Sequence, residues 1–500
     1  MKINVKQHTS FKDHVDVIVL PLFQNGDVMS GIAKKADKKI GGRLTAMIKE
    51  KQLTGKKDET AVLYGTTALK AKMIICVGLG KKACFSYPVL RNSAGNVGRI
   101  LTKLKTKRVL WALEGVLDNK RDPGYFGQAL MEGMILGGYT FNSFKTEDED
   151  TPVNQIKEII IGDVRRKDFF KLKSGAERGI IIANAVNQAR DLENTPSNFM
   201  TPLLFTEFAQ NACAKTTIEI EIIDKKKAES LGMQAFLGVS KGSDEAPYIL
   251  VLRYMPKPKQ APICLVGKGV TFDSGGISIK PSKGMEEMKG DMGGAAAVLS
   301  VVTALPMLGI KRNVCAIIPL VENMPSGKAQ KPGDVVKAMN GKSIEIVNTD
   351  AEGRLILADA LCYAVNQKPS VIIDIATLTG AVSVALGDVA AGILGNTQSM
   401  IKRFLKISQD TGDLLWQLPL YDDYLDYLKS DIADISNSSD KRLAGTANAA
   451  KFLEQFVDDL PWVHIDIAGV MHHTKDSGYT VKGMSGTGVR NILEFLLSAG

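Results

Sequence analysis

The chain has 500 residues, 45% of them hydrophobic and 23% charged, and a formal net charge of +9. This length exceeds what one compact core normally holds, so two or more domains are expected, and the composition excludes a disordered polypeptide. The best candidate for a membrane span, Val371 to Gly395, is interrupted by Asp374 and Asp388, which leaves too few apolar residues to cross a bilayer. No signal peptide is recognised and the six cysteines form no C-x-x-C pair, so we expect a soluble, cytoplasmic protein without membrane association.

Taken in chain order, the first third alternates between strand-like and helix-like segments. Apolar runs predict buried strands at 13–20, 61–65, 73–78 and 156–161, and helical spacing predicts helices at 90–105 and 124–139. We interpret residues 1–170 as a smaller N-terminal α/β domain. Residues 171–194 are predicted to form a connecting helix, because Pro196 forbids continuation and pushes Thr195 out of the helical region.

The remainder, residues 195–500, alternates more regularly and is predicted to be a larger C-terminal catalytic α/β domain. Predicted strands lie at 218–223, 248–254, 262–267, 313–319, 344–348, 371–375 and 463–467, and predicted helices at 203–214, 289–306, 354–366 and 446–458. Such alternation predicts a central mixed, largely parallel sheet with helices on both faces. Ligands of such sheets bind beyond the carboxyl ends of the strands, so the polar residues that follow the strands are candidates for a site.

Four carboxylates lie in the predicted strand-end loops and beside the helices that follow: Asp273, Asp291, Asp350 and Glu352. Carboxylates beside apolar helices are costly to ionise unless cations compensate them, and two divalent ions would balance all four. Asp350 and Glu352 are two residues apart, so in extended backbone they would point to the same side. As an alternative, these carboxylates could be helix N-caps or surface turns, and Asp291 and Asp350 each precede a helix. The joint pattern favours a metal site.

Three segments resemble the leucyl (cytosol) aminopeptidase family: 269–281 (GVTFDSGGISIKP), 291–295 (DMGGA) and 348–355 (NTDAEGRL), the last being that family's signature. Further similar segments lie at 194–198, 374–380, 462–469 and 486–490. The resemblance is strong over about residues 170–500 and looser over 1–170. It implies a metal-dependent aminopeptidase, a hydrolase that removes N-terminal residues, preferentially leucine and other apolar ones, from peptides.

The resemblance also implies the metal ligands. Asp273 and Glu352 would bridge two divalent ions, Lys268 and Asp291 would complete the tighter site, and Asp350 would complete the more exchangeable one. Lys268 can bind a metal only as the neutral amine, so its pKa must fall well below the ordinary value, which adjacent metal charge can achieve. Such oxygen-rich sites suit manganese, zinc or magnesium, and cobalt is compatible as well.

Two catalytic residues follow from the same resemblance. Lys280 would polarise the scissile carbonyl and stabilise the developing oxyanion, and Arg354 would hold a bicarbonate ion that relays a proton. The free α-amine of the peptide substrate would bind a metal ion. The implied substrate-binding residues are Met288, Asn348, Thr377, Leu378, Gly380 and Ala468. Apolar pockets separate similar side chains by only a few kcal/mol, so specificity should be broad.

Two other functions, a serine protease and a DNA-binding regulator, also have some support in the sequence. Ser274, in the string DSGG, could indicate a serine nucleophile, but none of the five histidines stands in the context of a catalytic triad. We therefore interpret Ser274 as a turn residue. The lysine clusters leave open an additional DNA-binding, regulatory role, in which they would contact phosphates. The family resemblance also implies a homohexamer.

Overall fold

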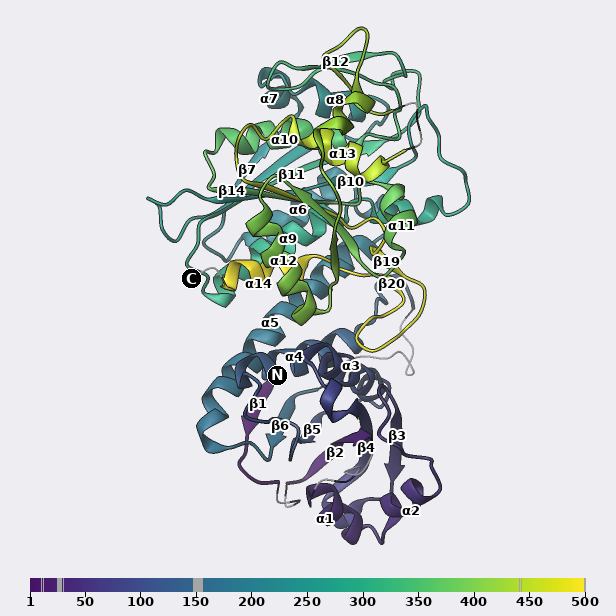
Figure 1. The fold of residues 1–500 in the computed structure, drawn as a ribbon, viewed down its shortest axis with the longest axis vertical. Coiled ribbons are helices and arrows are strands. Elements are labelled where there is room, and N and C mark those ends of the chain that lie inside the picture. Colours follow the sequence, from purple (N-terminus) through teal and green to yellow (C-terminus); the bar gives the residue numbers. More distant parts are fainter. Residues whose placement is uncertain are drawn as a thin grey trace. The chain divides into compact units, whose positions relative to one another are not determined.

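The computed structural model describes residues 1–9, 11, 13–24, 29, 31–146, 156–439, 441 and 443–498. The chain forms two compact units, Met1–Asn184 with Thr474–Lys482, and Ala185–His473 with Gly483–Gly500. Each unit is built on a sheet with helices on both sides, so the predicted α/β fold class is confirmed (Figure 1). The predicted domain limits, 1–170, 171–194 and 195–500, stay a prediction.

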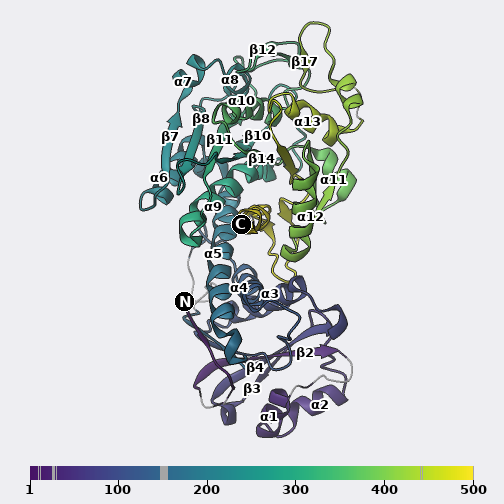
Figure 2. The same ribbon diagram turned by 60° about the vertical axis from the view of Figure 1, so that its left-hand side comes forward.

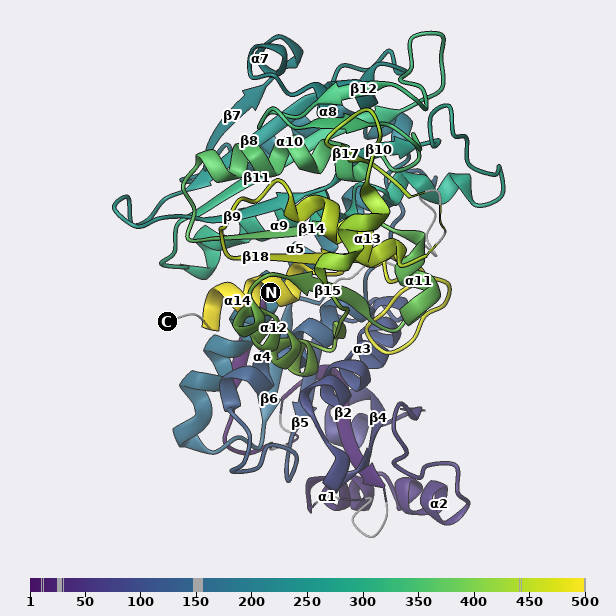
Figure 3. The same cartoon turned by 45° about the horizontal axis from the view of Figure 1, so that its top comes forward.

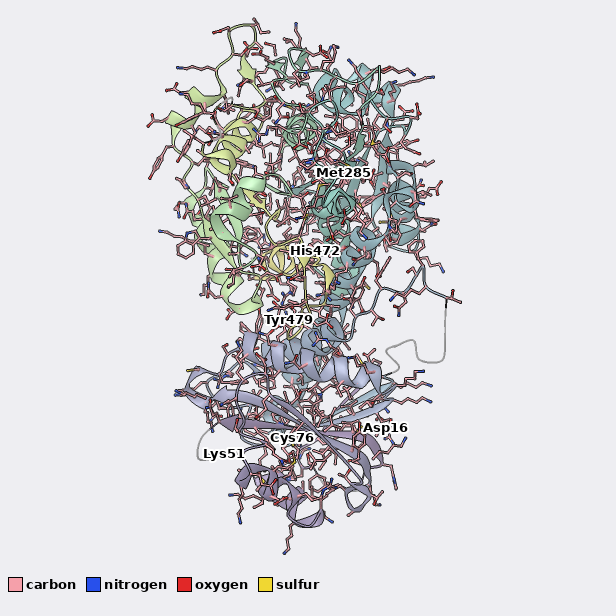
Figure 4. All side chains as sticks on the ribbon, turned by 90° about the vertical axis from the view of Figure 1, so that its right-hand side faces the viewer. Asp16, Lys51, Cys76, Met285, His472 and Tyr479 are labelled. Atoms are coloured by element: carbon pink, nitrogen blue, oxygen red, sulfur yellow. The ribbon has the colours of Figure 1, made fainter. Side chains whose placement is uncertain are left out.

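The first unit contains a six-stranded sheet in the order β1-β6-β5-β2-β4-β3. Its strands are β1 (Lys2–Val5), β2 (Val15–Gln24), β3 (Thr60–Tyr64), β4 (Ala71–Lys81), β5 (Arg108–Ala112) and β6 (Glu158–Gly162). Only β3 is antiparallel to its neighbour among these strands. Helices α3 (Tyr87–Lys103) and α4 (Pro123–Gly137) lie on one side, and α1 (Gly31–Lys39) and α2 (Arg43–Lys49) on the other (Figure 2). Cys76 lies inside this unit (Figure 4).

A segment distant in sequence completes this unit. Thr474–Lys482 belongs to it, and Arg99 of α3 donates from Nη2 to the carbonyl oxygens of Gly478 (2.9 Å) and Thr480 (2.8 Å). A β-carbon on Gly95 would lie 2.4 Å from the backbone nitrogen of Tyr479, so only glycine lets the segment approach α3 this closely. Tyr479 is labelled in Figure 4.

The second unit contains a nine-stranded sheet in the order β16-β15-β18-β14-β9-β11-β8-β7, with β10 beside β11. Its strands are β7 (Glu219–Ile223), β8 (Tyr248–Tyr254), β9 (Ile263–Gly267), β10 (Gly269–Asp273), β11 (Val314–Asn323), β14 (Val371–Ala376), β15 (Ala391–Gly395), β16 (Leu415–Gln417) and β18 (Trp462–Asp466). The central strands β18, β14, β9, β11 and β10 are mutually parallel, and antiparallel pairs flank them. This confirms the predicted mixed, largely parallel sheet.

Helices cover both faces of this larger sheet (Figure 3). One face carries α8 (Gln234–Ser240), α10 (Gly353–Asn366) and α13 (Gly445–Glu454), and the other carries α6 (Pro202–Cys213), α9 (Gly293–Leu308), α12 (Gln398–Thr411) and α14 (Val489–Ser498). The stretch Met285–Leu308 is long and apolar enough to cross a membrane, but 83% of its most apolar part is buried. That burial is typical of a core helix.

Two predicted features take a different form in this unit. The membrane candidate, Val371 to Gly395, forms β14, the short helix α11 (Gly380–Leu386) and β15. The run after Gly267, predicted as a strand-end loop, is largely strand β10, because its backbone pairs with β11 beyond the end of β9. The helix α5 (Phe169–Asn194) forms where a helix is predicted over residues 171–194.

Candidate metal centre

The polar residues of the candidate site gather at the carboxyl ends of the parallel strands. Lys268 follows β9, Asp273 ends β10, Asn323 ends β11, Thr377 follows β14 and Asp466 ends β18. Because these strands are parallel, their carboxyl ends share one edge of the sheet. The predicted location of the site therefore corresponds to a real concentration of polar side chains.

Acceptors enclose the ammonium group of Lys268 in one half of the site. Its Nζ lies 2.8 Å from Asp291 Oδ1, 2.9 Å from Glu352 Oε1 and 2.7 Å from the carbonyl oxygen of Thr377. The Thr377 hydroxyl donates to the same Asp291 oxygen over 2.7 Å. Lys268, Asp291, Glu352 and Thr377 are all buried, so these ion pairs form away from solvent.

Lys280 neutralises the other half of the site. Its Nζ lies 2.8 Å from Asp273 Oδ2 and 2.5 Å from Asp350 Oδ1. The second oxygen of Asp273 accepts hydrogen bonds from Asn323 Nδ2 (2.8 Å) and the Gly275 amide (2.9 Å). Gly275 has a φ of +85°, and a β-carbon there would lie 2.8 Å from Asp350 Oδ1. Glycine is therefore required at this turn by both conformation and space.

Three carboxylates converge between these lysines. One oxygen each from Asp273, Asp350 and Glu352 lies within 4.8 Å of the others, and Asp291 joins them through Lys268. Oδ2 of Asp291 is buried and has no hydrogen-bond partner among the described residues. Converging carboxylate oxygens and an unpaired buried acceptor both fit a divalent cation. The residues present therefore fit the metal ions that the family resemblance implies.

The prediction that extended backbone directs Asp350 and Glu352 to the same side is wrong. Their side chains converge for another reason. Thr349 and Asp350 form a turn, and Glu352 has helical dihedral angles (φ −74°, ψ −36°) at the start of α10. The alternative interpretation as helix caps is also wrong. The residues at the N-cap positions of α9 and α10 are Met292 and Glu352, and neither accepts a capping hydrogen bond within the described part of the chain.

The charges of this cluster shift several pKa values. Burial raises the pKa of Glu352 to about 8 and that of Asp291 to about 6, and the Asp273 carboxylate adds to both rises. Burial disfavours the charged forms of Lys268 and Lys280, but the facing carboxylates outweigh this effect and raise both pKa values above the ordinary range. The low pKa that metal binding by Lys268 requires is thus no property of the polypeptide alone, and it stays a prediction for the metal-loaded protein.

Arg354 lies buried at the start of α10. Its Nη1 donates to the carbonyl oxygen of Asn437 over 2.7 Å, whereas its Nε has no hydrogen-bond partner among the described residues. Burial lowers the pKa of Arg354 to about 10, against the opposing influence of Glu352 and Asp466. A buried guanidinium group with an unused N–H is suited to hold a small anion.

The implied substrate-binding residues lie on several loops. Thr377 contacts the cluster directly, and the amides of Leu378 (3.1 Å) and Ala468 (3.2 Å) both donate to Asp466 Oδ1. The Asn348 side chain accepts a hydrogen bond from the Asp350 amide over 2.9 Å. Gly380 begins α11 and is exposed.

Met288 lies on the path from β10 to Asp291. It belongs to the 3₁₀ helix Met285–Gly290, and its carbonyl oxygen accepts from the Asp291 amide over 3.2 Å. Met285, at the start of this helix, is labelled in Figure 4. Met288 therefore lies three residues before the proposed metal ligand Asp291 in the chain, on a segment separate from Leu378 and Ala468.

Three residues that organise the site are not predicted from the sequence. Asn323 binds Asp273, Asn437 binds Arg354 and donates to the Asn348 carbonyl oxygen (2.7 Å), and Asp466 binds two loops. Asn323 and Asp466 end apolar strands, so the strand-end rule could have pointed to both. Asn437 lies beyond a two-residue strand and had no such signal.

The fold and the site together define a two-unit α/β protein with an acidic, lysine-compensated centre at the carboxyl edge of its larger sheet. Comparison with known proteins narrows this class. Residues 187–493 match the cytosol aminopeptidase family, catalytic domain, and residues 19–148 match the N-terminal domain of the same family. The chain belongs to the cytosol aminopeptidase family, and it is accordingly an aminopeptidase, a hydrolase that acts on peptides.

Individual relatives are similar to this chain over nearly its full length. The probable cytosol aminopeptidase of Alkaliphilus oremlandii is 40% identical over 499 residues, which cover 100% of this chain and 99% of the relative. A mutant of tomato leucine aminopeptidase matches with a TM-score of 0.88 and 30% identity, covering 99% of this chain and 96% of that one. The bottromycin maturation enzyme BotP, in complex with Mn, matches with a TM-score of 0.84 and 29% identity, covering 96% and 99%. The predicted family and fold are confirmed.

Proposed function

We propose that this aminopeptidase releases leucine and other apolar residues from the N-termini of peptides with the help of two divalent metal ions. The convergence of Asp273, Asp350 and Glu352, whose oxygens lie within 4.8 Å of one another, carries this proposal. Membership of a metal-dependent family supports it, as does the Mn in the related BotP structure. Manganese or zinc are the ions we expect, and magnesium or cobalt also suit the ligands.

The proposed ligands divide between the two ions. Asp273 and Glu352 would bridge them, Lys268 and Asp291 would hold one, and Asp350 would hold the other. When bound, two such ions supply positive charge and a water molecule activated at neutral pH. The unpaired oxygen of Asp291 supports this assignment, because a buried acceptor without a partner is otherwise costly.

Lys280 and Arg354 have the proposed catalytic roles. Asp273 and Asp350 keep the ammonium group of Lys280 charged, and a charged donor beside the scissile carbonyl stabilises the oxyanion that develops there. Arg354 would hold bicarbonate with its unused Nε–H, and this anion supplies a proton acceptor next to the centre. Neither Lys280 nor Arg354 needs to change its charge to act in this way.

Selectivity is proposed to arise at the loops that flank the centre. Met288, Asn348, Thr377, Leu378, Gly380 and Ala468 would surround the first residue of the peptide. The free α-amine would bind at the acidic centre, which restricts cleavage to N-terminal residues. An apolar pocket of this kind favours a larger apolar side chain by about 1–3 kcal/mol for each additional methylene group. Several apolar residues besides leucine should therefore be released.

Hydrolysis of leucine anilide by the Mn²⁺-loaded protein tests the proposal. Activity should disappear with a chelator and return with Mn²⁺, and an N-acetylated leucine anilide should be inert. Glu352→Ala should lower turnover by at least about 10²–10³-fold, whereas the matched variant Glu229→Ala, at an exposed carboxylate on α7 (Lys225–Ser230), should not. The proposal fails if the metal-loaded wild type cleaves neither leucine anilide nor leucyl dipeptides.

Family membership also supports proposals on assembly and location. We expect a homohexamer, which light scattering would show as six times the chain mass of 54.0 kDa. The name of the relatives, cytosol aminopeptidase, supports a cytoplasmic location. No contact in the described part of the chain and none of the reported relatives supports the additional DNA-binding role.

A further inference from the structure

Asp466, at the carboxyl end of β18, collects an unusual number of donors on one buried carboxylate. Its Oδ1 accepts hydrogen bonds from the amides of Leu378 (3.1 Å), Ala468 (3.2 Å) and Thr379 (3.4 Å). Its Oδ2 accepts from the Thr379 hydroxyl over 2.6 Å. The Asp466 side chain is fully buried, so no water competes for these donors.

These donors belong to two separate loops, 377–380 after β14 and 466–468 after β18. The strands are parallel neighbours with Ala376 opposite Asp466, and their regular pairing ends there. Asp466 accepts hydrogen bonds from both loops just beyond the paired strands. The arrangement is the side-chain counterpart of the backbone hydrogen bonds that join the strands.

Thr379 extends the connection to two helices. Its hydroxyl oxygen accepts from the Val382 amide (3.2 Å) at the start of α11, and it lies 2.9 Å from the hydroxyl oxygen of Thr446 in the first turn of α13. A hydroxyl group can donate once and accept twice, so all three interactions are compatible. One carboxylate thereby determines the positions of both loops and of the first turn of α11.

The other end of the same loop reaches the metal centre. Thr377 donates to Asp291 over 2.7 Å, and its carbonyl oxygen accepts from Lys268 over 2.7 Å. The segment 377–380 is therefore held by the centre at one end and by Asp466 at the other. Leu378 directly follows the attachment at Thr377, and its own amide is bound to Asp466 Oδ1.

Buried polar side chains precede Asp466 on the same strand, β18. Trp462, His464 and Asp466 are spaced by two along β18 and so share one face of the sheet. Trp462 donates to Asp374 Oδ2 over 2.6 Å, and His464 Nδ1 lies 2.5 Å from Asp374 Oδ1. His464 and Asp374 are both buried, and these contacts join β14 to β18 at the strand ends that lead into the two loops.

We propose that Asp466 is a positioning residue that determines specificity for the first side chain of the substrate, by fixing the loops 377–380 and 466–468 relative to each other. This inference rests on the proposed function, because it requires that Leu378, Gly380 and Ala468 form the pocket. Asp466 itself does not contact the reacting atoms. Its effect should therefore fall on discrimination between substrates and leave metal binding unchanged.

The test compares leucine anilide with alanine anilide in metal-loaded variants. Asp466→Ala removes all four acceptor interactions, and the ratio of kcat/KM for leucine over alanine should fall at least 10-fold, chiefly through a higher KM for leucine. Asp466→Asn keeps one oxygen for the three amides, so its leucine-to-alanine ratio of kcat/KM should lie between those of the wild type and Asp466→Ala. Bound Mn²⁺ per chain should stay at the wild-type value in both.

Asp359→Ala is the matched control. Asp359 is another fully buried aspartate of the same unit, and it accepts the amides of Phe236 (2.8 Å) and Met339 (2.7 Å) without contacting either loop. This variant should lose stability and keep the wild-type ratio. If Asp466→Ala does not fold, Thr379→Val carries the test, since it replaces only the hydroxyl group by a methyl group, and it should lower the ratio as well.

Two outcomes would overturn the inference. One is an unchanged leucine-to-alanine ratio in the folded Asp466 variants or in Thr379→Val. The other is an equal loss of the ratio in Asp359→Ala, which would indicate a general effect of instability. Failure of the proposed function is distinct from both, because the wild type itself would then cleave neither anilide.

Discussion

Replacing Gly353 by alanine tests whether the ammonium group of Lys268 is held where the structure places it. Gly353 is the first residue of α10, and a β-carbon added there would lie 2.5 Å from Lys268 Cε and 2.8 Å from its Nζ. Carbon atoms in contact prefer about 3.5–4.0 Å, so Lys268 would have to retreat by about 1 Å. Its contacts of 2.8 Å with Asp291 and 2.9 Å with Glu352 would then exceed hydrogen-bond range.

The magnitude follows from two opposing effects. Overpacking a buried site costs about 1–3 kcal/mol, and replacing glycine by alanine in a helix returns at most about 1 kcal/mol. We expect Gly353→Ala to lower the free energy of unfolding by about 1–2 kcal/mol. Because Lys268 is a proposed ligand, the variant should also bind fewer Mn²⁺ ions per chain.

Gly380→Ala is the matched control for stability. Gly380 is also the first residue of a helix, α11, and no described atom lies within 4 Å of a β-carbon added there. Urea unfolding of the metal-free proteins measures stability, and equilibrium dialysis counts bound Mn²⁺. The reasoning is refuted if Gly353→Ala unfolds at the same urea concentration as Gly380→Ala and binds as much Mn²⁺ as the wild type.

Three further predictions concern metal binding and pH. Asn323→Ala, which deprives Asp273 of a donor, should weaken Mn²⁺ affinity by about 10–100-fold, and an unchanged calorimetric titration would contradict this. Adding Mn²⁺ at about 100 times its Kd should stabilise the metal-free protein by about 2.7 kcal/mol, so an unshifted urea midpoint would count against the site. Burial raises the pKa of Asp359 from 3.8 to about 7. The stability that protonated Asp359 contributes is fully present below its unfolded-state pKa and is lost as the pH rises towards 7. Urea unfolding should therefore show the wild type losing stability relative to Asp359→Asn over this pH range. Parallel plots of stability against pH for the two proteins would disprove this.

The elements predicted best were those with long apolar runs. The strands β11, β14 and β18 lie in the middle of the sheet, and burial on both faces requires almost continuous apolar sequence. β10 was missed because a single residue separates it from β9, and β15 because its sequence, AGILG, is short and rich in glycine. Such strands exist only through their neighbours, which a local pattern does not reveal.

The candidate site divides in the same way. Its charged residues were predicted because Asp350, Glu352 and Arg354 form a compact motif. The residues that hold them in place come from remote segments, and which loops Asp466 binds depends on the strand order β18-β14-β9. No spacing within a single segment encodes that order, so the loops that Asp466 binds could not be predicted, although its place at a strand end marks it as a candidate. Asn437 had no such signal.

The segment that completes the first unit has a consequence for the order of events during synthesis. The first 184 residues leave the ribosome early, but Arg99 has no Gly478 or Thr480 carbonyl to bind until the segment 474–482 emerges. At about 5–20 residues per second, the roughly 300 residues in between take about 15–60 s. The unit made first is therefore finished almost last, and any chain that stops before residue 474 leaves the Gly95 face of α3 uncovered.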